Sequence, residues 1–362
     1  MDYRHFIFLL SDIHFGGGGE RVTTNMANYF VSQGNTVSIV SISQSKSQNP
    51  FFLDSRVNID YLNINLKRKS KLLRKIESVF AVRKYFSKVN TETFVLAIGT
   101  YPALLVALLP NLDCLIKIGC QHNSYSATKH FWFILRFVLF RRLNCLISLT
   151  RFDEPKLKKL NNKVFIIPNS ISFTPIQSAK LENKTILSIG RLDYLKGYDL
   201  LIEVFERYCR SNKDWKLRII GDGPLREQIT KIIIEKGLTN RISLITMSNT
   251  IMEEYLNASI YVMTSRSEGL PMVLLEAQAF GLPIVAFDCE TGPSEIIQNG
   301  ISGYLIANYD IDEMKEKLIE LSNNLLKRIE FGKNALENIK RFHPEEIFYK
   351  WDMVFRELEQ RN

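Results

Sequence analysis

The sequence predicts an α/β protein made of two doubly wound halves, each built on a parallel sheet. The first observation is that short apolar runs alternate with stretches of helical spacing along the chain, which is typical of parallel sheets covered on both faces. The second is a polar segment at 168–183 that contains two prolines and lacks periodicity. The third is size, because 362 residues that are 46% hydrophobic are enough for two cores.

The first half, residues 1–170, is expected to form a Rossmann-like domain. A buried strand at 6–10 is followed by a glycine loop at 16–19 and by a helix over 22–30 that ends at Gly34. Further strands are expected at 37–42, 94–98, 114–118, 145–149 and 164–167.

The second half, residues 184–343, repeats the alternation and is expected to form a second Rossmann-like domain. Its strands are expected at 184–189, 216–220, 242–245, 260–263 and 284–287, and its helices at 199–209, 225–236, 252–256 and 271–280. Residues 344–362 carry one amphipathic helix, which we expect to pack back toward the first domain. Open α/β sheets bind ligands at the carboxyl ends of their strands, so the two domains are expected to face a central cleft.

The sequence argues against a membrane-spanning helix, a signal peptide and a site built from cysteines. There is no run of eighteen apolar residues, and the apolar stretch at 6–10 is too short for a signal peptide before Asp12 interrupts it. The cysteines are odd in number and lack C-x-x-C spacing: 114, 120, 145, 209 and 289. They argue against a cysteine-built metal or disulfide site and fit a reducing cytoplasm.

The net charge of +9 is concentrated in the first half. Residues 1–178 carry 23 Lys and Arg against 10 Asp and Glu, whereas residues 179–362 carry 24 against 28. Two segments, 67–88 and 129–142, place cations beside large apolar side chains and are similar to interfacial helices that bind anionic membranes. The alternative is a pair of ordinary basic surface helices. Nucleic acid is not an expected partner, because no zinc-finger, helix-turn-helix or RNA-recognition signature is present.

Two loops that follow strands have the chemistry of phosphate sites. The glycines at 16–19 would let the backbone approach a phosphate at a helix start, although the spacing is not G-x-G-x-x-G and a flexible turn is the alternative. Arg191 and Lys196 lie on the loop after the strand at 184–189. Two cations at a strand end suit a diphosphate, with arginine as a fork and lysine as a point charge.

The most informative stretch is 267–277, which reads SEGLPMVLLEA. Pro271 suits the first turn of a helix, where its missing N–H costs little, and Gly269 allows a sharp turn. An anion site at the positive end of this helix would use backbone amides, namely those of Leu270, Met272 and Val273.

Glu268 and Glu276 stand on either side of that helix start. Because a carboxylate beside a phosphate is repelled, we expect Glu268 to accept hydrogen bonds from sugar hydroxyls and Glu276 from a ribose. The alternative is that both are helix-end and surface carboxylates.

Together these motifs resemble the retaining glycosyltransferases of family four, which have the GT-B architecture. The E-x7-E pattern runs from Glu268 to Glu276 within SRSEGLPMVLLEAQAFGLPIVA, and SIGRLDYLKG, IIGDGPLREQI and GGGGERV also match. QHNS around His122 and IIPNSI around Asn169 match more loosely. The resemblance covers nearly the whole chain and is strongest at 184–305.

The resemblance implies that a sugar is transferred from a nucleotide-sugar with retention of anomeric configuration. It implies that Arg191 and Lys196 hold the donor diphosphate, that Glu268 meets the donor sugar and that Glu276 binds the ribose. The amides near Leu270 to Val273 would meet phosphate and sugar, and Gly269 belongs to the same donor-binding segment.

Four further residues are assigned by the same resemblance. Gly17 and Gly18 match the glycine pair of the first loop, and Gly221 lies in the matched donor-binding segment. His122 matches a histidine that faces the reacting centre, the alternative being an ordinary loop histidine.

No metal cofactor is expected. The cations and the helix terminus would stabilise the negative charge that develops on the leaving diphosphate. The sequence Asp310-Ile311-Asp312 has D-x-D spacing but is interpreted as a helix start.

Substrates and location are also implied by the resemblance. DCETGPSEIIQNG is similar to relatives that build bacterial surface polysaccharides, which favours UDP-linked hexose or N-acetylhexosamine donors over GDP-linked ones. After the strand at 242–245 the family usually has a glycine, but residues 246–249 read TMSN. Recognition of the nucleotide base by this loop is therefore not assigned. The acceptor is expected to be a glycan or a polyprenyl-diphosphate-linked glycan, met at the cytoplasmic face of the inner membrane by a peripherally bound enzyme.

Three other functions remain open at this point. A UDP-sugar 2-epimerase on a similar scaffold would convert its substrate with no acceptor present. A non-catalytic sugar-nucleotide-binding protein would keep the fold without turnover, and a nucleic-acid binder would show salt-sensitive oligonucleotide binding.

Overall fold

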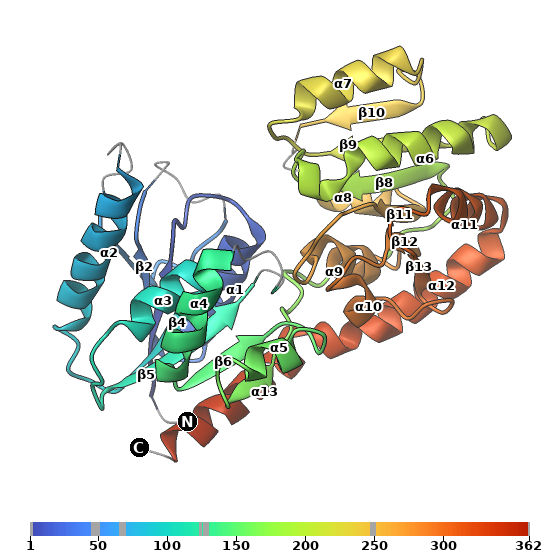
Figure 1. The fold of residues 1–362 in the computed structure, drawn as a ribbon. Coiled ribbons are helices and arrows are strands. Elements are labelled where there is room, and N and C mark those ends of the chain that lie inside the picture. The colour runs from blue at the N-terminus through green and yellow to red at the C-terminus, as the bar shows by residue number, and fades with distance from the viewer. Residues whose placement is uncertain are drawn as a thin grey trace. The chain divides into compact units, whose positions relative to one another are not determined.

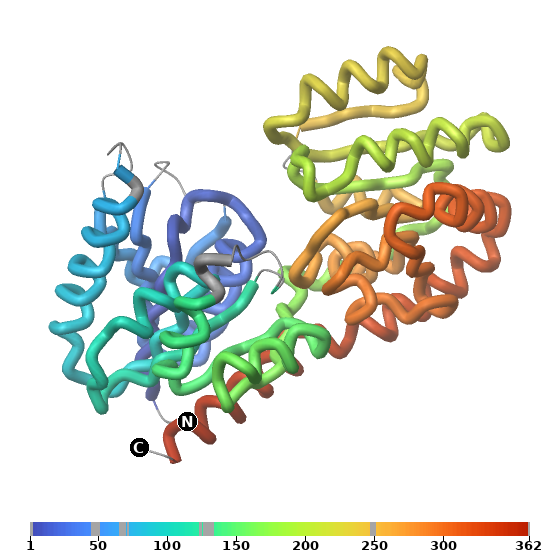
Figure 2. The backbone as a smooth tube through the Cα atoms, viewed as in Figure 1, coloured from blue at the N-terminus to red at the C-terminus, as the bar shows by residue number. Residues whose placement is uncertain are grey.

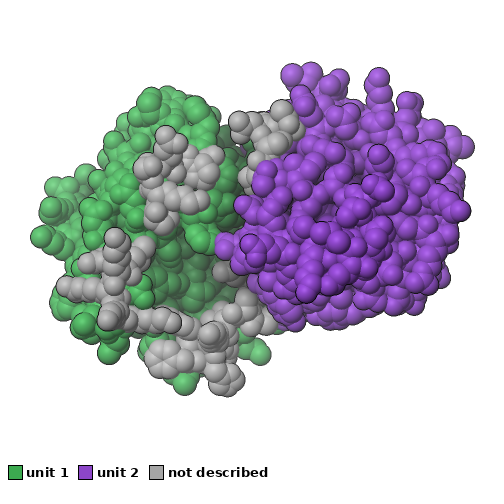
Figure 3. Space-filling view, turned by 90° about the horizontal axis from the view of Figure 1, so that it is seen from above, with its two compact units in different colours: residues 1–172, 348–362 green, residues 173–347 purple. Residues whose placement is uncertain are grey.

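The chain folds into two units in the computed structural model. The first comprises Met1–Ser172 with Phe348–Asn362, and the second Phe173–Ile347 (Figure 3). The structure describes residues 3–44, 51–64, 70–122, 125, 130–246 and 251–360, without the side chains of 71 and 130–133.

The first unit is built on a seven-stranded parallel sheet (Figure 1). Its strands are β1 (His5–Leu10), β2 (Thr36–Ser41), β3 (Asn58–Tyr61), β4 (Thr93–Ile98), β5 (Leu115–Gln121), β6 (Cys145–Ser148) and β7 (Val164–Ile166). Their order in the sheet is β3-β2-β1-β4-β5-β6-β7. The order therefore reverses between β1 and β4, the kind of point at which open α/β sheets bind ligands.

Helices cover both faces of this sheet. They are α1 (Gly18–Ser32), α2 (Lys71–Phe86), α3 (Thr100–Ala107), α4 (His130–Leu139), α5 (Glu154–Lys158) and α13 (Pro344–Glu359), with a 3₁₀ turn η2 (Phe140–Arg142). Successive residues of β1 point to opposite faces of the sheet. Ile7 and Leu9 pack in the core under α2, α3 and α5, whereas Phe6 stacks on Phe30 of α1 with ring centroids 4.4 Å apart.

The last helix, α13, belongs to the first unit from Phe348 onward. Its Phe355 is 1% exposed and lies with its ring centroid 5.0 Å from that of Phe6. The Arg4 guanidinium donates to Asp352 at 2.6 Å and to Glu359 at 2.6 and 2.9 Å. The two ends of the chain are thereby held together, as the tube in Figure 2 shows.

The second unit is built on a six-stranded parallel sheet with the order β10-β9-β8-β11-β12-β13. Its strands are β8 (Thr185–Ile189), β9 (Lys216–Ile220), β10 (Ile242–Ile245), β11 (Ile260–Met263), β12 (Ile284–Phe287) and β13 (Gly303–Ile306). The order reverses between β8 and β11, so this sheet has its own switch point.

The helices of the second unit are α6 (Tyr198–Ser211), α7 (Arg226–Glu235), α8 (Ile251–Leu256), α9 (Met272–Ala279), α10 (Pro293–Ile296), α11 (Ile311–Asn323) and α12 (Leu325–Asn338), with 3₁₀ turns η3 (Tyr194–Lys196) and η4 (Ile339–Phe342). One core gathers α6, α7 and α11 on one side of the sheet. Two parallel-sheet α/β units confirm the predicted fold class.

The structure differs from the sequence-based elements in both units. Helix α1 begins at Gly18, so only Gly16 and Gly17 of the glycine run precede it. Strands β3 and β13 and helices α3, α5, α10 and α12 are additional to the predicted elements. Helix α3 has no polar face to mark its period, because its residues 102–107 are all buried.

All five cysteines are free thiols. Within the described residues, none of the helices combines the length and the apolar content that crossing a bilayer requires.

Candidate functional site

The switch point of the second sheet brings Lys196 and Glu268 together. Lys196 ends η3 on the loop after β8, and Glu268 lies on the loop after β11. Lys196 Nζ donates to Glu268 Oε1 at 2.6 Å, with 29% and 9% of the two side chains exposed. Burial lowers the pKa of Lys196, but the charge and hydrogen bond of Glu268 outweigh it, and the net pKa is raised. Lys196 is therefore a fixed ammonium at neutral pH.

The loop that carries Lys196 is shaped by its own backbone. The Asp193 carboxylate accepts the amides of Leu195 at 3.0 Å and Lys196 at 3.3 Å, which starts the 3₁₀ turn. Gly197 follows with φ of +65°, and a Cβ there would lie 2.1 Å from the carbonyl oxygen of Thr264. Only glycine fits at this position, and the close contact with Thr264 fixes the backbone next to Lys196.

Arg266 ties the two loops together and was not identified from the sequence. Its guanidinium donates to the Asp199 carboxylate at 2.6 and 2.9 Å and to the carbonyl of Tyr194 at 2.8 Å. The charge-assisted bond from Arg266 holds the pKa of Asp199 below its usual value. The signal in the sequence was an arginine two residues before Glu268, inside the matched SRSE segment.

Arg191 lies on the same loop as Lys196, as expected. Its side chain is 52% exposed, and its Nε is 3.8 Å from Asp193 Oδ2. The structure thus leaves this guanidinium at the surface of the loop, not within the ion pair of Lys196 and Glu268.

Gly221 follows β9 and lies against the loop after β8. A Cβ on Gly221 would lie 1.9 Å from the carbonyl oxygen of Gly190. The two loops are also joined by hydrogen bonds from Gly190 N to the carbonyl of Ile220 at 3.0 Å and from Leu192 N to that of Asp222 at 2.9 Å. Close approach of two backbones accounts for this glycine, whatever it binds.

Helix α9 begins one residue later than predicted. Pro271 is its N-cap, with ψ of 107°, and not a member of its first turn, so the expectation for this residue is corrected. The difference arises because the Pro271 carbonyl already accepts from Leu274 N at 3.1 Å while its own backbone is still extended. Met272 and Val273 are the first two helical residues, whose amides have no acceptor within an α-helix.

The turn before α9 is braced from the loop after β12. Gly292 has φ of +99°, and a Cβ there would lie 2.5 Å from Pro271 Cδ and 2.6 Å from the carbonyl oxygen of Gly269. The Thr291 hydroxyl donates to the backbone carbonyl of Glu268. Gly269 itself is half-buried, and Leu270 is 5% exposed.

Glu276 lies on α9 and is 3% exposed. The hydroxyl of Tyr255, a fully buried residue of α8, donates to Glu276 Oε2 at 2.8 Å, and the Tyr255 ring stacks on Phe280. The surface alternative for Glu276 is therefore wrong, because the carboxylate is buried and hydrogen-bonded.

The glycine loop of the first unit is already occupied by a carboxylate. Glu20 in the first turn of α1 folds back, and its Oε2 accepts from Gly17 N at 2.9 Å. Burial, and to a smaller extent the nearby charge of Asp12, raises the pKa of Glu20. Gly18 has open space around the position of a Cβ. A phosphate at Gly17 N would have to displace Glu20.

His14 lies on the same loop and was not identified from the sequence. It is 2% exposed, and its Nε2 lies 3.0 Å from the hydroxyl of Tyr61 at the end of β3. Nothing in its sequence surroundings marked it, because the contact joins positions 47 residues apart.

His122 directly follows β5 and is half-buried. Burial lowers the pKa of this imidazole to about 4. It is therefore neutral throughout the physiological range. Its neighbours 123 and 124 in the matched QHNS segment lie outside the described residues.

A pH test follows for His122. Below its ordinary pKa of 6.5 the unfolded chain takes up a proton at this residue, while the folded chain does so only near pH 4. Stability contributed by His122 is therefore lost as the pH falls from 6.5 toward 4. We expect the melting temperature of the wild type to fall more than that of His122→Gln between pH 7 and pH 5, measured by thermal unfolding. Equal losses would contradict a neutral His122 imidazole in the folded chain.

The D-x-D sequence begins a helix, as predicted. Asp310 is the N-cap of α11 and accepts from Glu313 N at 2.8 Å, while Asp312 pairs with Arg207 at 3.1 Å. Among the residues that the structure describes, no three His, Cys, Asp or Glu side chains gather at one place. Residues 247–250, in the loop left unassigned for base recognition, lie outside the described residues.

Sequence relatives are found over the whole chain. It is 30% identical over 353 residues to an uncharacterized glycosyltransferase of Haemophilus influenzae, covering 95% of this chain and 98% of that protein. It is 27% identical to the amylovoran biosynthesis glycosyltransferase AmsD of Erwinia amylovora, covering 96% and 98%. It is 23% identical to a Campylobacter jejuni α-1,4-N-acetyl-D-galactosaminyltransferase whose name gives a PP-undecaprenol-linked glycan, covering 97% and 98%.

Solved structures share the fold. TarM of S. aureus, in complex with fondaparinux, α-GlcNAc-glycerol and UDP, superposes with a TM-score of 0.80 at 19% identity over 97% of this chain and 99% of that one. Sucrose-phosphate synthase of Thermosynechococcus elongatus superposes with a TM-score of 0.84 at 16% identity over 99% and 100%.

The family model described as "Glycosyl transferases group 1" matches residues 172–338, the part of the chain that holds Lys196, Glu268 and Glu276. With these relatives, the chain belongs to the group 1 glycosyltransferases, a family of retaining sugar-transferring enzymes with the GT-B fold.

Proposed function

We propose that this enzyme moves a hexose or N-acetylhexosamine from a UDP-sugar to a glycan or polyprenyl-diphosphate-linked acceptor in surface polysaccharide synthesis. The observation that carries the proposal is the ion pair of Lys196 and Glu268 at the switch point of the second sheet. The Lys196 ammonium can bind a diphosphate, and the neighbouring Glu268 carboxylate can accept hydrogen bonds from sugar hydroxyls. A nucleotide-sugar needs both kinds of contact, because it carries a diphosphate and a sugar.

The leaving diphosphate would be stabilised by positive charge. Lys196 is a fixed ammonium, the exposed guanidinium of Arg191 stands on the same loop, and the first amides of α9 lie after Pro271. Cations and a helix N-terminus held in place before the reaction stabilise charge that develops as the glycosidic bond breaks. Arg266 and Gly197 would contribute indirectly, because they fix the loop that carries Lys196.

Glu268 would bind the donor sugar and Glu276 the ribose. A carboxylate accepts hydrogen bonds at both oxygens, so Glu268 can hold Lys196 through one and a hydroxyl through the other. Tyr255 fixes the orientation of Glu276 through Oε2. The turn of Gly269 and Leu270 and the amides of Met272 and Val273 would complete the donor site.

In the first unit, we retain His122 as a neutral group near the reacting sugar and Gly18 as the open position of the glycine loop. Gly17 can contribute its amide only after the Glu20 carboxylate has left it. A neutral imidazole donates or accepts a hydrogen bond without adding charge at the reacting centre.

Relatives support the choice of substrates. TarM was solved with UDP, the Campylobacter relative acts on a PP-undecaprenol-linked glycan, and the Erwinia relative serves amylovoran synthesis. From these we propose a UDP-linked donor and a lipid-linked glycan acceptor. We place the enzyme at the cytoplasmic face of the inner membrane, bound peripherally.

A thermal-shift screen of UDP- and GDP-sugars tests the donor. A ligand present at a hundredfold excess over its Kd adds about 2.7 kcal/mol to the free energy of unfolding. We expect a UDP-sugar to raise the melting temperature of the wild type and to raise that of Arg191→Met less. If no nucleotide-sugar shifts the wild type, the proposed function is wrong.

The epimerase alternative has its own readout. An epimerase would convert the UDP-sugar with no acceptor present, whereas a transferase would yield glycosylated acceptor with the anomeric configuration of the donor. Incubation of the positive donor with and without a polyprenyl-diphosphate-linked glycan, followed by NMR of the products, separates the two.

A further inference from the structure

Helix α2 of the first unit exposes a continuous row of large apolar side chains. Leu72 is 67% exposed, Leu73 53%, Ile76 45% and Phe80 66%. Their spacing of four residues, from Leu72 to Ile76 to Phe80, places them on one side of the helix. The opposite side is packed normally, since Val82 and Phe86 are buried in the core. Single exposed apolar residues are ordinary, but a row of this kind marks an interaction surface.

Helix α4 presents a second row of the same kind. Ile134 is 67% exposed, Phe137 42% and Val138 60%, and the Arg141 guanidinium lies 4.4 Å from the centre of the Phe137 ring. Helices α2 and α4 both contact α3, so all three belong to one layer on the same face of the first sheet (Figure 1). We name the exposed residues of α2 and α4 given above the apolar rows.

The chain around these rows is strongly basic. Residues 67–88 contain nine Lys or Arg and one acid, Glu77, and residues 129–142 contain four Lys or Arg and no acid. Within the described part, Lys84 and Lys88 are exposed beyond the apolar row of α2. Arg141 and Arg142 after α4 are exposed as well, whereas Arg136 of α4 is buried. The described part of this surface therefore combines exposed apolar area with an excess of positive charge.

The combination selects among possible occupants. A second copy of this chain would bring one cationic surface against another, which like-charge repulsion disfavours. An anionic lipid bilayer offers acyl chains to the apolar rows and phosphate headgroups to the cations around them.

We propose that the apolar rows of α2 and α4 are a docking surface for anionic membranes. The inference deepens the proposed function, because it names the surface by which the enzyme would reach a lipid-linked acceptor. The inference depends only on residues of the first unit and involves none of the donor-site residues.

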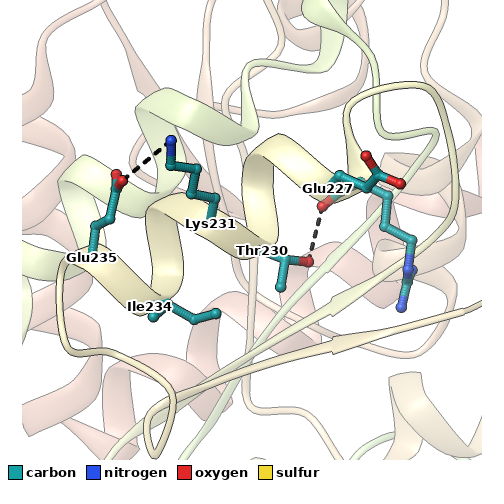
Figure 4. A pocket seen from close by; sticks show the side chains of 6 residues that line it. Glu227, Thr230, Lys231, Ile234 and Glu235 are labelled. Carbon is teal, nitrogen blue, oxygen red and sulfur yellow. Dashed lines mark hydrogen bonds and ion pairs between the residues drawn. The ribbon is translucent and has the colours of Figure 1, made fainter.

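Helix α7 of the second unit supplies a matched control. Ile234 on α7 is 60% exposed, as the apolar residues of α2 are, and borders a shallow depression whose lining also includes Arg226, Glu227, Lys231 and Glu235 (Figure 4). Lys231 pairs with Glu235 at 3.7 Å. The charges around Ile234 balance, so this exposed apolar residue should not attract an anionic bilayer.

The test is flotation of the purified full chain with phosphatidylcholine vesicles that contain or lack phosphatidylglycerol. We expect binding to the anionic vesicles at low salt that weakens at high salt. The double variant Ile76→Glu/Phe80→Glu should bind about tenfold more weakly or worse, since it loses apolar insertion and gains repulsion. Ile234→Glu should bind as the wild type does. Should Ile76→Glu/Phe80→Glu fail to fold by circular dichroism, Lys84→Glu/Lys88→Glu takes its place, with the same loss expected.

The proposal is overturned if the wild type ignores anionic vesicles at low salt, or if the α2 variants and Ile234→Glu bind equally. Lys196→Met separates this inference from the proposed function. It should lose sugar transfer and keep vesicle binding, whereas the α2 variants should keep turnover on a water-soluble acceptor. Vesicle binding without any donor specificity would leave the docking surface standing and the proposed function refuted.

Discussion

Replacing Lys196 by methionine is expected to lower both the turnover and the stability of the enzyme. Loss of a preorganised cation at the leaving group should reduce kcat by about 10²- to 10³-fold. The substitution also leaves the Glu268 carboxylate, 9% exposed, without its ammonium partner. Because Lys196 keeps 29% of its side chain in solvent, the free energy of unfolding should fall by about 2 kcal/mol, less than for a fully buried pair. Steady-state kinetics and urea unfolding measure the two effects.

A second substitution separates those effects. In Lys196→Met/Glu268→Gln the unpaired charge is gone, so most of the lost stability should return while turnover stays low. Arg191→Met is the matched control, because its guanidinium is 52% exposed: it should lose turnover with a change in stability of under about 0.5 kcal/mol. Normal turnover of Arg191→Met would remove that residue from the donor site. Unchanged stability of Lys196→Met would show that the ion pair contributes nothing to folding.

Gly197→Ala should be among the most damaging single-methyl additions in the second unit. The new Cβ would lie 2.1 Å from the carbonyl oxygen of Thr264, which is backbone and cannot turn aside. The residue would also have to hold φ of +65°, at a cost of about 1 to 2 kcal/mol. We expect a total loss of about 4 kcal/mol or more in the free energy of unfolding. Turnover should fall as well, because Lys196 is the preceding residue.

Gly237→Ala isolates the backbone cost. Gly237 lies in the same unit with φ of +67°, and a Cβ there would meet no atom within 4 Å. Gly237→Ala should therefore lower the free energy of unfolding only by the cost of the left-handed conformation, about 1 to 2 kcal/mol. Urea unfolding of both variants gives the difference that belongs to the contact with Thr264. Equal losses would mean that the two loops separate without cost.

The sequence predicted the regular frame of the molecule because each element carried its own signal. The strand at 6–10 became β1, and the runs at 216–220 and 242–245 became β9 and β10. Strand β3 was missed because its residues 58–61 are not strongly apolar and remain partly exposed at the sheet edge. Helix α3 was missed for the opposite reason, since burial on nearly every side removed the amphipathic period.

The candidate site could be predicted as a set of residues but not as a set of contacts. Strand-end loops and the E-x7-E spacing indicated Lys196, Glu268 and Glu276. The pairing of Lys196 with Glu268 spans 72 positions and depends on which strands are neighbours, which no local pattern contains. The capture of the Gly17 amide by Glu20 is only three residues long, yet the same short spacing fits either an open phosphate loop or a self-capped one.

The bond between Arg4 and Glu359 has a consequence for how the protein is made. These residues are 355 positions apart, and the whole second unit lies between them in the chain. A ribosome therefore completes every residue of the second unit before it adds Trp351 and Phe355 to the aromatic face beside Phe6. The second unit is one uninterrupted segment of the chain, whereas the aromatic face of the first stays uncovered until α13 has been made. The first unit therefore gains its last packing contacts after the whole second unit has been synthesised.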